Sequence, residues 1–340
     1  MILVVTEPDD VTASHVIGKL LSRGADVARF DPAHFPSRAS VSIAIDSAHR
    51  ASATLAIDNA TIELHRLDAL WFRRPRLPVP HDEIRNAEVR GYLEAECAQY
   101  LQDVWNLLDC RFLPAAPWAI ARAELKASQL ALARSVGFEL PPTLVSNSPD
   151  AFLDFHLAHG GQVISKIPGP AFNRHLSERF ARYTEVVARQ DLGYADSVRF
   201  GPAIFQAYVP KRVELRITVV GAQVFAAEIH SQASRRTQHD WRRYDLDHTR
   251  HLPHALPAEV EHCCVRLVER LGLCYGAIDM VLTPDGRYVF LEINPNGQFL
   301  WIEKLTGLPI SDAICDLLMA PRPSPAHATP VCVENIGAFA

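Results

Sequence analysis

The residues that most constrain this chain lie in two apolar segments near its C-terminus. Asp279 stands in the first segment, and Glu292 and Asn294 stand in the second. The pattern predicts a β-hairpin, with a strand around Asp279, a turn at 284–286 and a second strand over 288–293. Residues two apart share one face of a strand, so we expect Glu292 and Asn294 to point to the same side, close to Asp279.

Three converging oxygen-bearing side chains indicate a Mg²⁺ site. Carboxylate and amide oxygens are hard ligands, and Mg²⁺ keeps several waters and also takes phosphate oxygens of a substrate. The other interpretation is an exposed hairpin whose polar residues face water. We favour the metal site, because charged side chains among apolar neighbours such as Ile278, Phe290 and Ile293 need a partner.

The length and composition are those of an ordinary globular protein. A chain of 340 residues exceeds one core and predicts two or three domains. Its net charge of −5 and the absence of a basic run argue against a nucleic-acid partner. The sequence has no long apolar run and no basic segment before its first apolar residues. We therefore expect no membrane span, no signal peptide and a cytoplasmic location.

The cysteines and histidines offer a weaker signal. The seven cysteines show no CxxC spacing, which is typical of buried thiols in a reducing compartment. A zinc site is one interpretation of the histidines between 230 and 254, but their spacing matches no ligand pattern, and we favour histidines in surface loops. The group comprises His230, His239, His248, His251 and His254.

The order of predicted elements indicates an α/β protein. A strand over 2–6, a helix over 12–22 and a strand over 27–30 form a β-α-β unit, which predicts a parallel sheet. A helix over about 121–136 follows the first domain. We place the boundaries so that the chain has four parts: an N-terminal domain over 1–116, a central part over 117–202, a C-terminal part over 203–320 and a loose tail over 321–340.

Further residues fit a phosphate-binding cleft beside the hairpin. Lys166 ends an apolar strand and faces a loop rich in Pro and Gly, of which 168–173 is our candidate lid. Lysine is scarce in this chain, so each internal lysine is notable. The strand at 204–209 could offer backbone groups to an adenine edge. The remaining candidates are Lys126, Glu214 and Arg216.

Together these features resemble the nucleotide site of the ATP-grasp ligases. Two lysines, a hinge strand followed by an acid, and an Asp with a later Glu-x-Asn occur in the order and spacing of that superfamily over about 117–318. Several segments are also similar to the graspetide (microviridin-type) macrocyclases, which mature ribosomal peptides (RiPPs), and they extend the resemblance to nearly the whole chain. These segments are Trp71–Pro75, Lys126–Leu130, Phe205–Lys211, Glu214–Arg216 and Asp240–Arg242.

The resemblance implies a fold and a set of roles. The fold would be an N-terminal pre-ATP-grasp domain with a parallel sheet, followed by two ATP-grasp subdomains that clamp ATP between antiparallel sheets. Lys126 and Lys166 would bind the α- and β-phosphates, and Glu214 the ribose. Arg216 would lie near the γ-phosphate. The adenine would be held by Gln206, Ala207, Tyr208 and Val209, and two Mg²⁺ ions by Asp279, Glu292 and Asn294.

Two positions depart from the superfamily pattern. Ala207 stands where many members carry a hinge acid, so we expect only backbone contacts there. Ala277 stands where some ligases place a phosphate-binding arginine. Arg216, or Arg242 or Arg243 from the loop, would then have to supply that charge.

Other roles are not assigned by the resemblance. No general base for the acceptor can be identified, and Glu228, His230 and Asp240 are merely near in sequence. Arg73 and Arg74 could shape the rim of the site, form a dimer contact or make a structural salt bridge.

The resemblance predicts an enzyme that joins Glu or Asp side chains of a precursor peptide to Ser or Thr hydroxyls, as esters, or to Lys amines, as amides. Its partners would be the leader and core of that peptide and a second copy of the chain, in a homodimer. One alternative is a RimK-like ligase that adds an amino acid or glutamate to a small substrate or protein tail. Another is a non-catalytic module that binds peptides in a nucleotide-dependent way.

Overall fold

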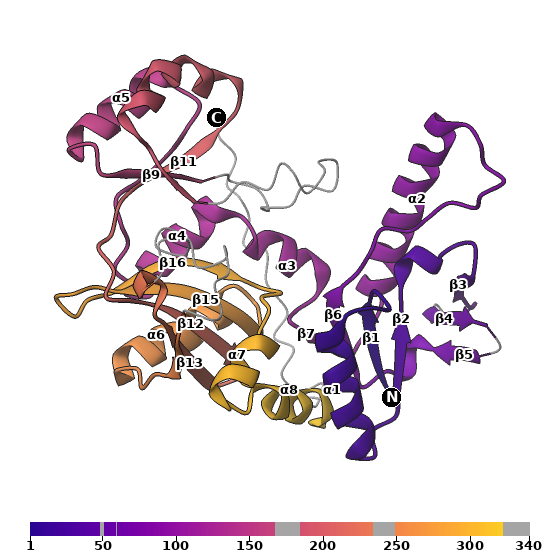
Figure 1. Cartoon of the computed structure of the whole chain (residues 1–340). Coiled ribbons are helices and arrows are strands. Elements are labelled where there is room, and N and C mark those ends of the chain that lie inside the picture. Colours follow the sequence, from indigo (N-terminus) through magenta and orange to yellow (C-terminus); the bar gives the residue numbers. More distant parts are fainter. Residues whose placement is uncertain (48–50, 59, 167–183, 234–248, 322–340) are drawn as a thin grey trace, which may run out of the picture.

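The structure is a computed structural model that describes residues 1–47, 51–58, 60–166, 184–233 and 249–321. The candidate lid at 168–173, the segment Asp240–Arg242 with Arg243, and the tail from residue 322 onward lie outside these ranges. Figure 1 shows an N-terminal domain, which holds two sheets, and a central and a C-terminal subdomain, which hold one sheet each. No helix in the described ranges is long and apolar enough to cross a membrane.

The N-terminal domain contains the expected parallel sheet. Every residue of its first strand is buried, as in strands that are covered on both faces. The strands lie in the order β2-β1-β6-β7 and all neighbouring pairs are parallel. They are β1 (Ile2–Thr6), β2 (Val27–Phe30), β6 (Ala69–Arg74) and β7 (Arg111–Leu113), accompanied by α1 (Val11–Ser22) and α2 (Ala87–Asn106).

A small antiparallel sheet extends this domain beside α2 (Figure 1). Apolar residues on one face of its strands, such as Val41 and Leu55, join the same core as Phe72 and Trp105. The strands are β3 (Ala39–Ile45), β4 (Ala51–Ile57) and β5 (Ala60–Glu63).

The central subdomain is a four-stranded antiparallel sheet with one covered face. Phe205 of the sheet stacks on Phe152 of α5, with ring centroids 4.3 Å apart. Ile164, Lys166 and Gln206 alternate with the covered residues and therefore belong to the opposite face. The elements are β8 (Thr143–Ser146), α5 (Pro149–Ala158), β9 (Val163–Lys166), β10 (Glu185–Val186), a 3₁₀ segment η4 (Arg189–Phe200) and β11 (Ala203–Ala207).

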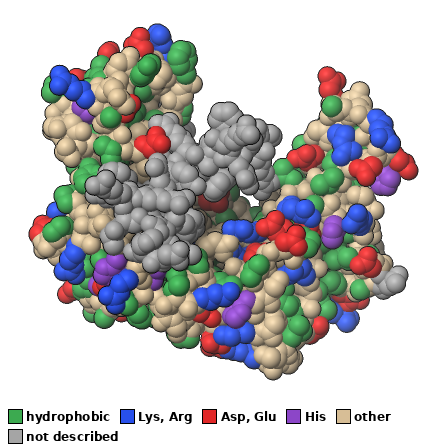
Figure 2. All heavy atoms as spheres, in the orientation of Figure 1, with side chains coloured by type: hydrophobic (Ala, Val, Ile, Leu, Met, Phe, Trp, Pro, Cys, Tyr) green, Lys and Arg blue, Asp and Glu red, His purple; other side chains and the backbone are tan. Residues whose placement is uncertain are grey.

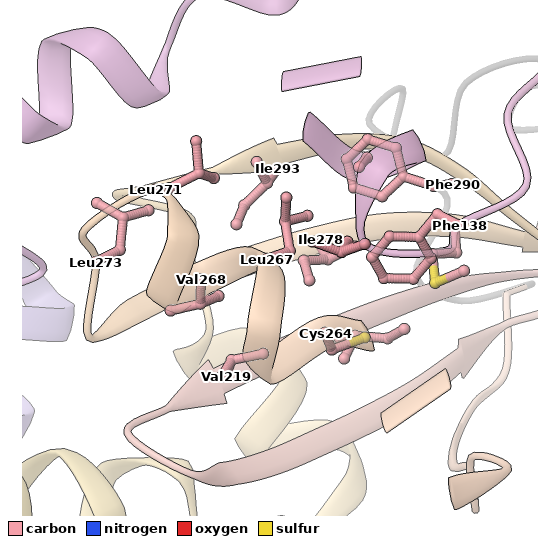
Figure 3. Close-up of a cluster of buried hydrophobic side chains, with 14 of the residues drawn as sticks. Phe138, Val219, Cys264, Leu267, Val268, Leu271, Leu273, Ile278, Phe290 and Ile293 are labelled. Carbon is pink, nitrogen blue, oxygen red and sulfur yellow. The ribbon is translucent and has the colours of Figure 1, made fainter. Parts of the chain in front are cut away.

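The C-terminal subdomain is a five-stranded antiparallel sheet packed against α6. Leu267 and Val268 of this helix meet Ile278 and Ile293 of the sheet in the cluster that Figure 3 shows. The sheet order is β14-β13-β12-β15-β16. Its elements are β12 (Val213–Val220), β13 (Gln223–Ile229), β14 (His251–Pro253), α6 (Ala258–Arg270), β15 (Tyr275–Leu282) and β16 (Tyr288–Asn294).

Two C-terminal helices join this subdomain to the N-terminal domain. They are α7 (Leu300–Thr306) and α8 (Ile310–Met319). Ile314 of α8 lies in one apolar cluster with Val16 of α1 and Phe225 of β13. An ion pair between Nζ of Lys19 and Oδ1 of Asp312, 2.9 Å apart, borders the same contact. The N-terminal domain and the C-terminal subdomain therefore share a continuous core.

The linker before the central subdomain differs from the expected single helix over 121–136. It is two helices, α3 (Pro117–Ala123) and α4 (Lys126–Ser135). Leu125 has an extended backbone between them, and the side chain of Gln129 donates to the carbonyl of Ala123. The Gln129 side chain thus satisfies a helix-end carbonyl that would otherwise lack a partner.

Candidate active site

A cleft lies where the open face of the central sheet faces the C-terminal sheet. Both sheets contribute apolar walls, including Ile164, Val281 and Leu291. The polar groups at its edges come from both sheets and from the strand that links them. Eight residues expected from the sequence line this cleft: Lys166, Gln206, Ala207, Tyr208, Val209, Glu214, Asp279 and Glu292.

The hairpin of β15 and β16 sets the positions of its acidic residues through a β-bulge. Asp279 is paired with Glu292, whereas Met280 is paired with Phe290, so Leu291 is an extra residue in β16. The bulge explains how Phe290 and Ile293, three residues apart, both enter the core. It also lets the consecutive residues Leu291 and Glu292 both line the cleft. Asp279 and Glu292 therefore face each other at the cleft edge.

Each of these two carboxylates faces a basic side chain. Arg216 lies opposite Asp279 in the sheet, and its Nη1 donates to both carboxylate oxygens at 2.9 Å. Lys126, at the start of α4, places its Nζ 2.7 Å from Oε2 of Glu292. Such pairing compensates charges that are partly removed from water. Lys126 and Arg216 thus lie beside the cleft, each in contact with one of the acidic residues that line it.

Gln129 also contributes to this arrangement, although it has no role among those expected from the sequence. Its side chain is buried, and it donates to the carbonyl of Ile293 at 2.8 Å and accepts from the N–H of Ile293 at 3.3 Å. β16 is the edge strand of its sheet, so the amide replaces a missing strand partner between Glu292 and Asn294. The sequence carries no signal for this role, because it depends on the packing of α4 against β16.

Asn294 ends β16 and lies outside the set that lines the cleft. It is exposed, is paired with Ala277 in the sheet, and accepts from the N–H of Asn296 through Oδ1 at 2.9 Å. Its position two residues after Glu292 keeps both side chains on one face. Two carboxylates and an amide are a donor set that fits Mg²⁺, which prefers oxygen ligands.

The central sheet holds Lys166 through a chain of polar contacts. Lys166 Nζ donates to Oε1 of Gln206 at 2.9 Å, and Nε2 of Gln206 donates to Oγ1 of Thr143 at 3.0 Å. Gln206 is buried, so this chain satisfies its amide. The ammonium group of Lys166 is thereby fixed at the edge of the cleft.

The backbone N–H groups of the strand that links the two subdomains differ in their partners. The N–H of Ala207 bonds to the carbonyl of Pro142 at 2.9 Å, and the N–H of Tyr208 bonds to that of Gln162 at 2.8 Å. No described residue accepts from the N–H of Val209. The N–H groups of Ala207 and Tyr208 therefore already donate hydrogen bonds within the central subdomain.

Glu214 is buried where β12 begins at the cleft. It accepts from Nζ of Lys211 at 2.7 Å and from Oγ of Ser231 at 2.9 Å. These bonds stabilise a carboxylate that is largely removed from water. Lys211 has no role among those expected from the sequence, although its position three residues before Glu214 could have indicated the pair.

Glu228 and His230, considered for the acceptor base, form a separate cluster. Glu228 is paired with Leu215, so it shares the α6 face of the sheet rather than the face of Arg216. It accepts from ring nitrogens of His254 at 2.7 Å and His230 at 2.9 Å. Burial alone would raise the pKa of Glu228, but the two histidines outweigh it and lower the pKa.

This cluster does not form a zinc site in the described ranges, where no group of at least three His, Cys, Asp or Glu side chains is placed to hold a metal ion. His239 and His248 of the histidine group, and Asp240 of the base candidates, lie outside those ranges.

Comparisons with known proteins identify relatives of this chain. A family model described as the MvdD pre-ATP grasp domain matches residues 1–117. The macrocyclase MdnC from Microcystis aeruginosa MRC, solved with its precursor peptide MdnA, has a TM-score of 0.81 and 32% identity, covering 94% of this chain and 99% of that chain. A RiPP-associated ATP-grasp ligase from Chryseobacterium gregarium, solved with ADP and a leader and core peptide, has a TM-score of 0.84 and 30% identity, covering 94% and 97%.

A weaker match is human N-acetylaspartylglutamate synthase A. It is 25% identical over 125 residues, which span 36% of this chain and only 31% of the human protein.

The chain has the fold of the ATP-grasp ligases. It belongs to the family that contains the RiPP macrocyclases, as its identity to MdnC over nearly the full length shows. The expected fold class and the expected resemblance to graspetide maturases are thus confirmed.

Proposed function

We propose that this enzyme activates Glu or Asp side chains of a ribosomal precursor peptide with ATP and joins them to Ser or Thr hydroxyls or Lys amines of the same peptide. The observation that carries the proposal is the placement of Asp279 opposite Glu292 at a cleft bordered by three cationic side chains, Lys126, Lys166 and Arg216. Phosphoryl transfer asks a protein mainly for positioning and for charge stabilisation, and this set supplies both.

The nucleotide would lie between the two sheets. Ile164, Val281 and Leu291 offer apolar contact to the adenine ring from both sides. Because the neighbouring N–H groups are used within the sheet, Val209 is the donor we propose for the adenine edge. Glu214 would accept from the ribose hydroxyls, while Lys126 and Lys166 would bind the α- and β-phosphates.

Asp279, Glu292 and Asn294 would hold Mg²⁺, and we propose two ions, the number that the resemblance to the ATP-grasp ligases implies. Bound Mg²⁺ supplies charge stabilisation to the phosphate oxygens. The protein's part is to orient its ligands: Gln129 fixes the backbone between Glu292 and Asn294, and Arg216 fixes Asp279. Arg216 is also placed to approach the γ-phosphate and the substrate carboxylate.

The chemistry balances without a further reactant. A carboxylate oxygen of the peptide attacks the γ-phosphorus, which gives an acyl phosphate and releases ADP. The acceptor oxygen or nitrogen then attacks the acyl carbon, loses its proton and releases phosphate, which leaves an ester or an amide. Each link therefore removes one water from the peptide. Water must be excluded meanwhile, because an acyl phosphate is readily hydrolysed.

A second hollow supports a peptide as the substrate. It lies between α2, α3 and the end of β6, and Asn296 forms part of its lining, two residues beyond Asn294. Its walls are partly apolar, with Phe72, Trp105 and Ile120. Figure 2 shows the molecule hollowed on the side of α2. A core peptide in this hollow would reach the candidate metal site.

The finer partners and location are proposals of the same kind. The helical layer of α5 and η4 exposes Leu157, Tyr194 and Phe200, each at least 74% exposed, and we propose it as the surface for the leader. We also propose a homodimer, for which Tyr92 on α2 is an exposed apolar residue. The proposed use of ATP and the six free cysteines in the described ranges support a cytoplasmic location.

The proposal is tested by phosphate release. The purified enzyme is incubated with ATP and Mg²⁺, once with a candidate precursor peptide and once with free amino acids. We expect turnover only with the peptide. Equal turnover with free glutamate would instead favour a small-substrate ligase, the RimK-like alternative, for which the partial match to human N-acetylaspartylglutamate synthase A is the specific support.

A further inference from the structure

One arginine of the N-terminal domain reaches into the site of the C-terminal subdomain. Arg73 belongs to β6, and only 2% of it is exposed. Its Nη1 donates to the carbonyl of Asn296 at 2.9 Å, and its Nη2 donates to Oε1 of Gln298. Both partners belong to the segment Asn294–Gln298, which we name the NPNGQ loop. The loop that continues from the candidate metal ligand Asn294 is thus held by a different domain.

Arg73 is itself held in place on its own side. Its Nε lies 3.5 Å from Oδ2 of Asp10, and both side chains are 2% exposed. Asp10 caps α1, because its Oδ1 accepts from the N–H groups of Thr12 and Ala13 at 2.9 and 3.0 Å. Thr12 also donates to Oε1 of Gln298 at 3.0 Å. The start of α1 and the end of β6 therefore present a fixed surface to the loop.

The opposite side of the NPNGQ loop is bound by the C-terminal sheet. Arg216 Nη2 donates to the carbonyl of Gln298 at 3.2 Å, and the hydroxyl of Tyr275 donates to that of Gly297 at 2.5 Å. Burial raises the pKa of Tyr275 to about 12, so it keeps its proton at neutral pH. Arg73 and Arg216 thus bind the same loop from two domains, and Gln298 accepts a hydrogen bond from each of them.

The loop is closely packed at Gly297, on the side of Ala277 and Arg216. A Cβ atom on Gly297 would lie 2.3 Å from Cβ of Ala277 and 2.5 Å from Nη2 of Arg216. A small displacement of the loop would therefore meet the guanidinium that pairs with Asp279. The position of Arg216 and that of the loop are consequently linked.

We propose that Arg73 is a positioning residue, which fixes the NPNGQ loop and thereby sets Asn294 and Arg216 for binding of the metal–nucleotide complex. Its burial excludes the rim and dimer roles that the sequence left open for Arg73. The inference rests on the proposed function, because it needs a Mg²⁺ site at Asn294.

The test compares ADP binding with and without Mg²⁺ in the full-length enzyme, by calorimetry. Partners that orient metal ligands typically contribute about 10- to 100-fold in metal affinity. We therefore expect Arg73→Met to reduce the Mg²⁺-dependent gain in ADP affinity by at least ~10-fold, with little change in ADP binding without Mg²⁺. Arg73→Lys keeps the positive charge beside Asp10 but loses the two guanidinium nitrogens that donate to the loop. This variant should recover part of the Mg²⁺-dependent gain in ADP affinity. Arg74→Met, at the exposed neighbouring position, is the matched control.

The outcomes separate the inference from the proposed function. If the wild-type enzyme binds ADP equally with and without Mg²⁺, the proposed metal site is wrong. If the wild-type enzyme shows the Mg²⁺ gain and Arg73→Met retains it in full, the positioning role is wrong. Should Arg73→Met fail to fold, Gln298→Met removes the acceptor of Arg73 and Thr12 and is expected to give the same selective loss. An intact gain in that variant would overturn the inference.

Discussion

Arg216 and Asp279 lie opposite each other on β12 and β15, and one guanidinium nitrogen donates to both carboxylate oxygens at 2.9 Å. Glu292, the neighbour of Asp279 on β16, forms an ion pair with Lys126 of α4, whose Nζ lies 2.7 Å from Oε2. Acidic and basic side chains therefore alternate across the site. We infer that these ion pairs hold Lys126 and Arg216 beside the candidate metal ligands, where phosphate oxygens of the nucleotide would also bind.

Loss of the Glu292 charge should abolish most of the activity. In Glu292→Gln the side chain keeps its size but becomes a poor metal ligand, and a loss of ~3 kcal/mol in transition-state stabilisation is a rate about 100-fold lower. Peptide-dependent phosphate release measures the effect. Asp285→Asn, in the exposed turn of the same hairpin, should retain the wild-type rate. Comparable rates in Glu292→Gln and wild type would exclude Glu292 as a metal ligand.

The Arg216–Asp279 pair should show strong coupling in stability. Arg216→Met removes the guanidinium nitrogen that donates to both carboxylate oxygens of Asp279, and breaking a buried pair destabilises by about 3–5 kcal/mol. Urea unfolding checks this value. The double variant Arg216→Met/Asp279→Asn should be more stable than Arg216→Met alone, because the uncompensated charge is gone. Additive losses would show that the pair is not coupled.

Gln129→Leu should weaken both the fold and the reaction. The substitution leaves the carbonyl of Ala123 and the peptide groups of Ile293 without their partner, at about 1–3 kcal/mol for each unsatisfied buried group. The strand between Glu292 and Asn294 would also lose its support. Thermal unfolding and phosphate release measure the two effects. Ser128→Ala, at the exposed neighbouring position of α4, is expected to change neither.

Gly297→Ala should be destabilising because a methyl group would collide with Ala277 and Arg216. Gly18→Ala provides the contrast: it lies on an exposed turn of α1 with no atom within 4 Å of the added Cβ, and alanine favours a helix by ~1 kcal/mol. Melting temperatures should therefore fall for the first variant and rise slightly for the second. A wild-type melting temperature in Gly297→Ala would contradict the tight packing of the NPNGQ loop.

The Glu228 cluster predicts a loss of stability in acid. Because the pKa of Glu228 is lowered in the folded protein, its contribution is present above the unfolded value of 4.5 and is lost as pH falls through the lower folded value. The drop in melting temperature between about pH 6 and about pH 3.5 should thus be smaller in Glu228→Gln than in the wild type. Glu259→Gln, exposed at the start of α6, should follow the wild type. Identical pH profiles for Glu228→Gln and wild type would contradict the stabilising role.

Much of the fold follows from local patterns in the sequence. The apolar run at 2–6 and the hairpin around 284–286 are predicted by period and turn residues, and both form as expected. The short helix α7 and the break before Lys126 were not predicted. Both lie between segments that pack on distant parts of the chain, and the Gln129 contacts at the break depend on β16, which is 164 residues away.

The candidate site shows a similar division. The spacing of Glu292 and Asn294 indicates their shared face, but the bulge at Leu291 has no sequence signal of its own. The pairing of Lys126 with Glu292 joins two different elements, and Arg73 reaches Asn296 across 223 residues. Contacts of this kind depend on how domains pack, which local periodicity does not encode.

The most direct test of the proposed function is the intact mass of a candidate precursor peptide, rich in Glu or Asp and in Ser, Thr or Lys, after incubation with enzyme, ATP and Mg²⁺. We predict the loss of one water mass for each link formed, and no loss with Glu292→Gln. An unchanged peptide mass while ATP is consumed would contradict macrocyclisation and would favour a ligase for small substrates.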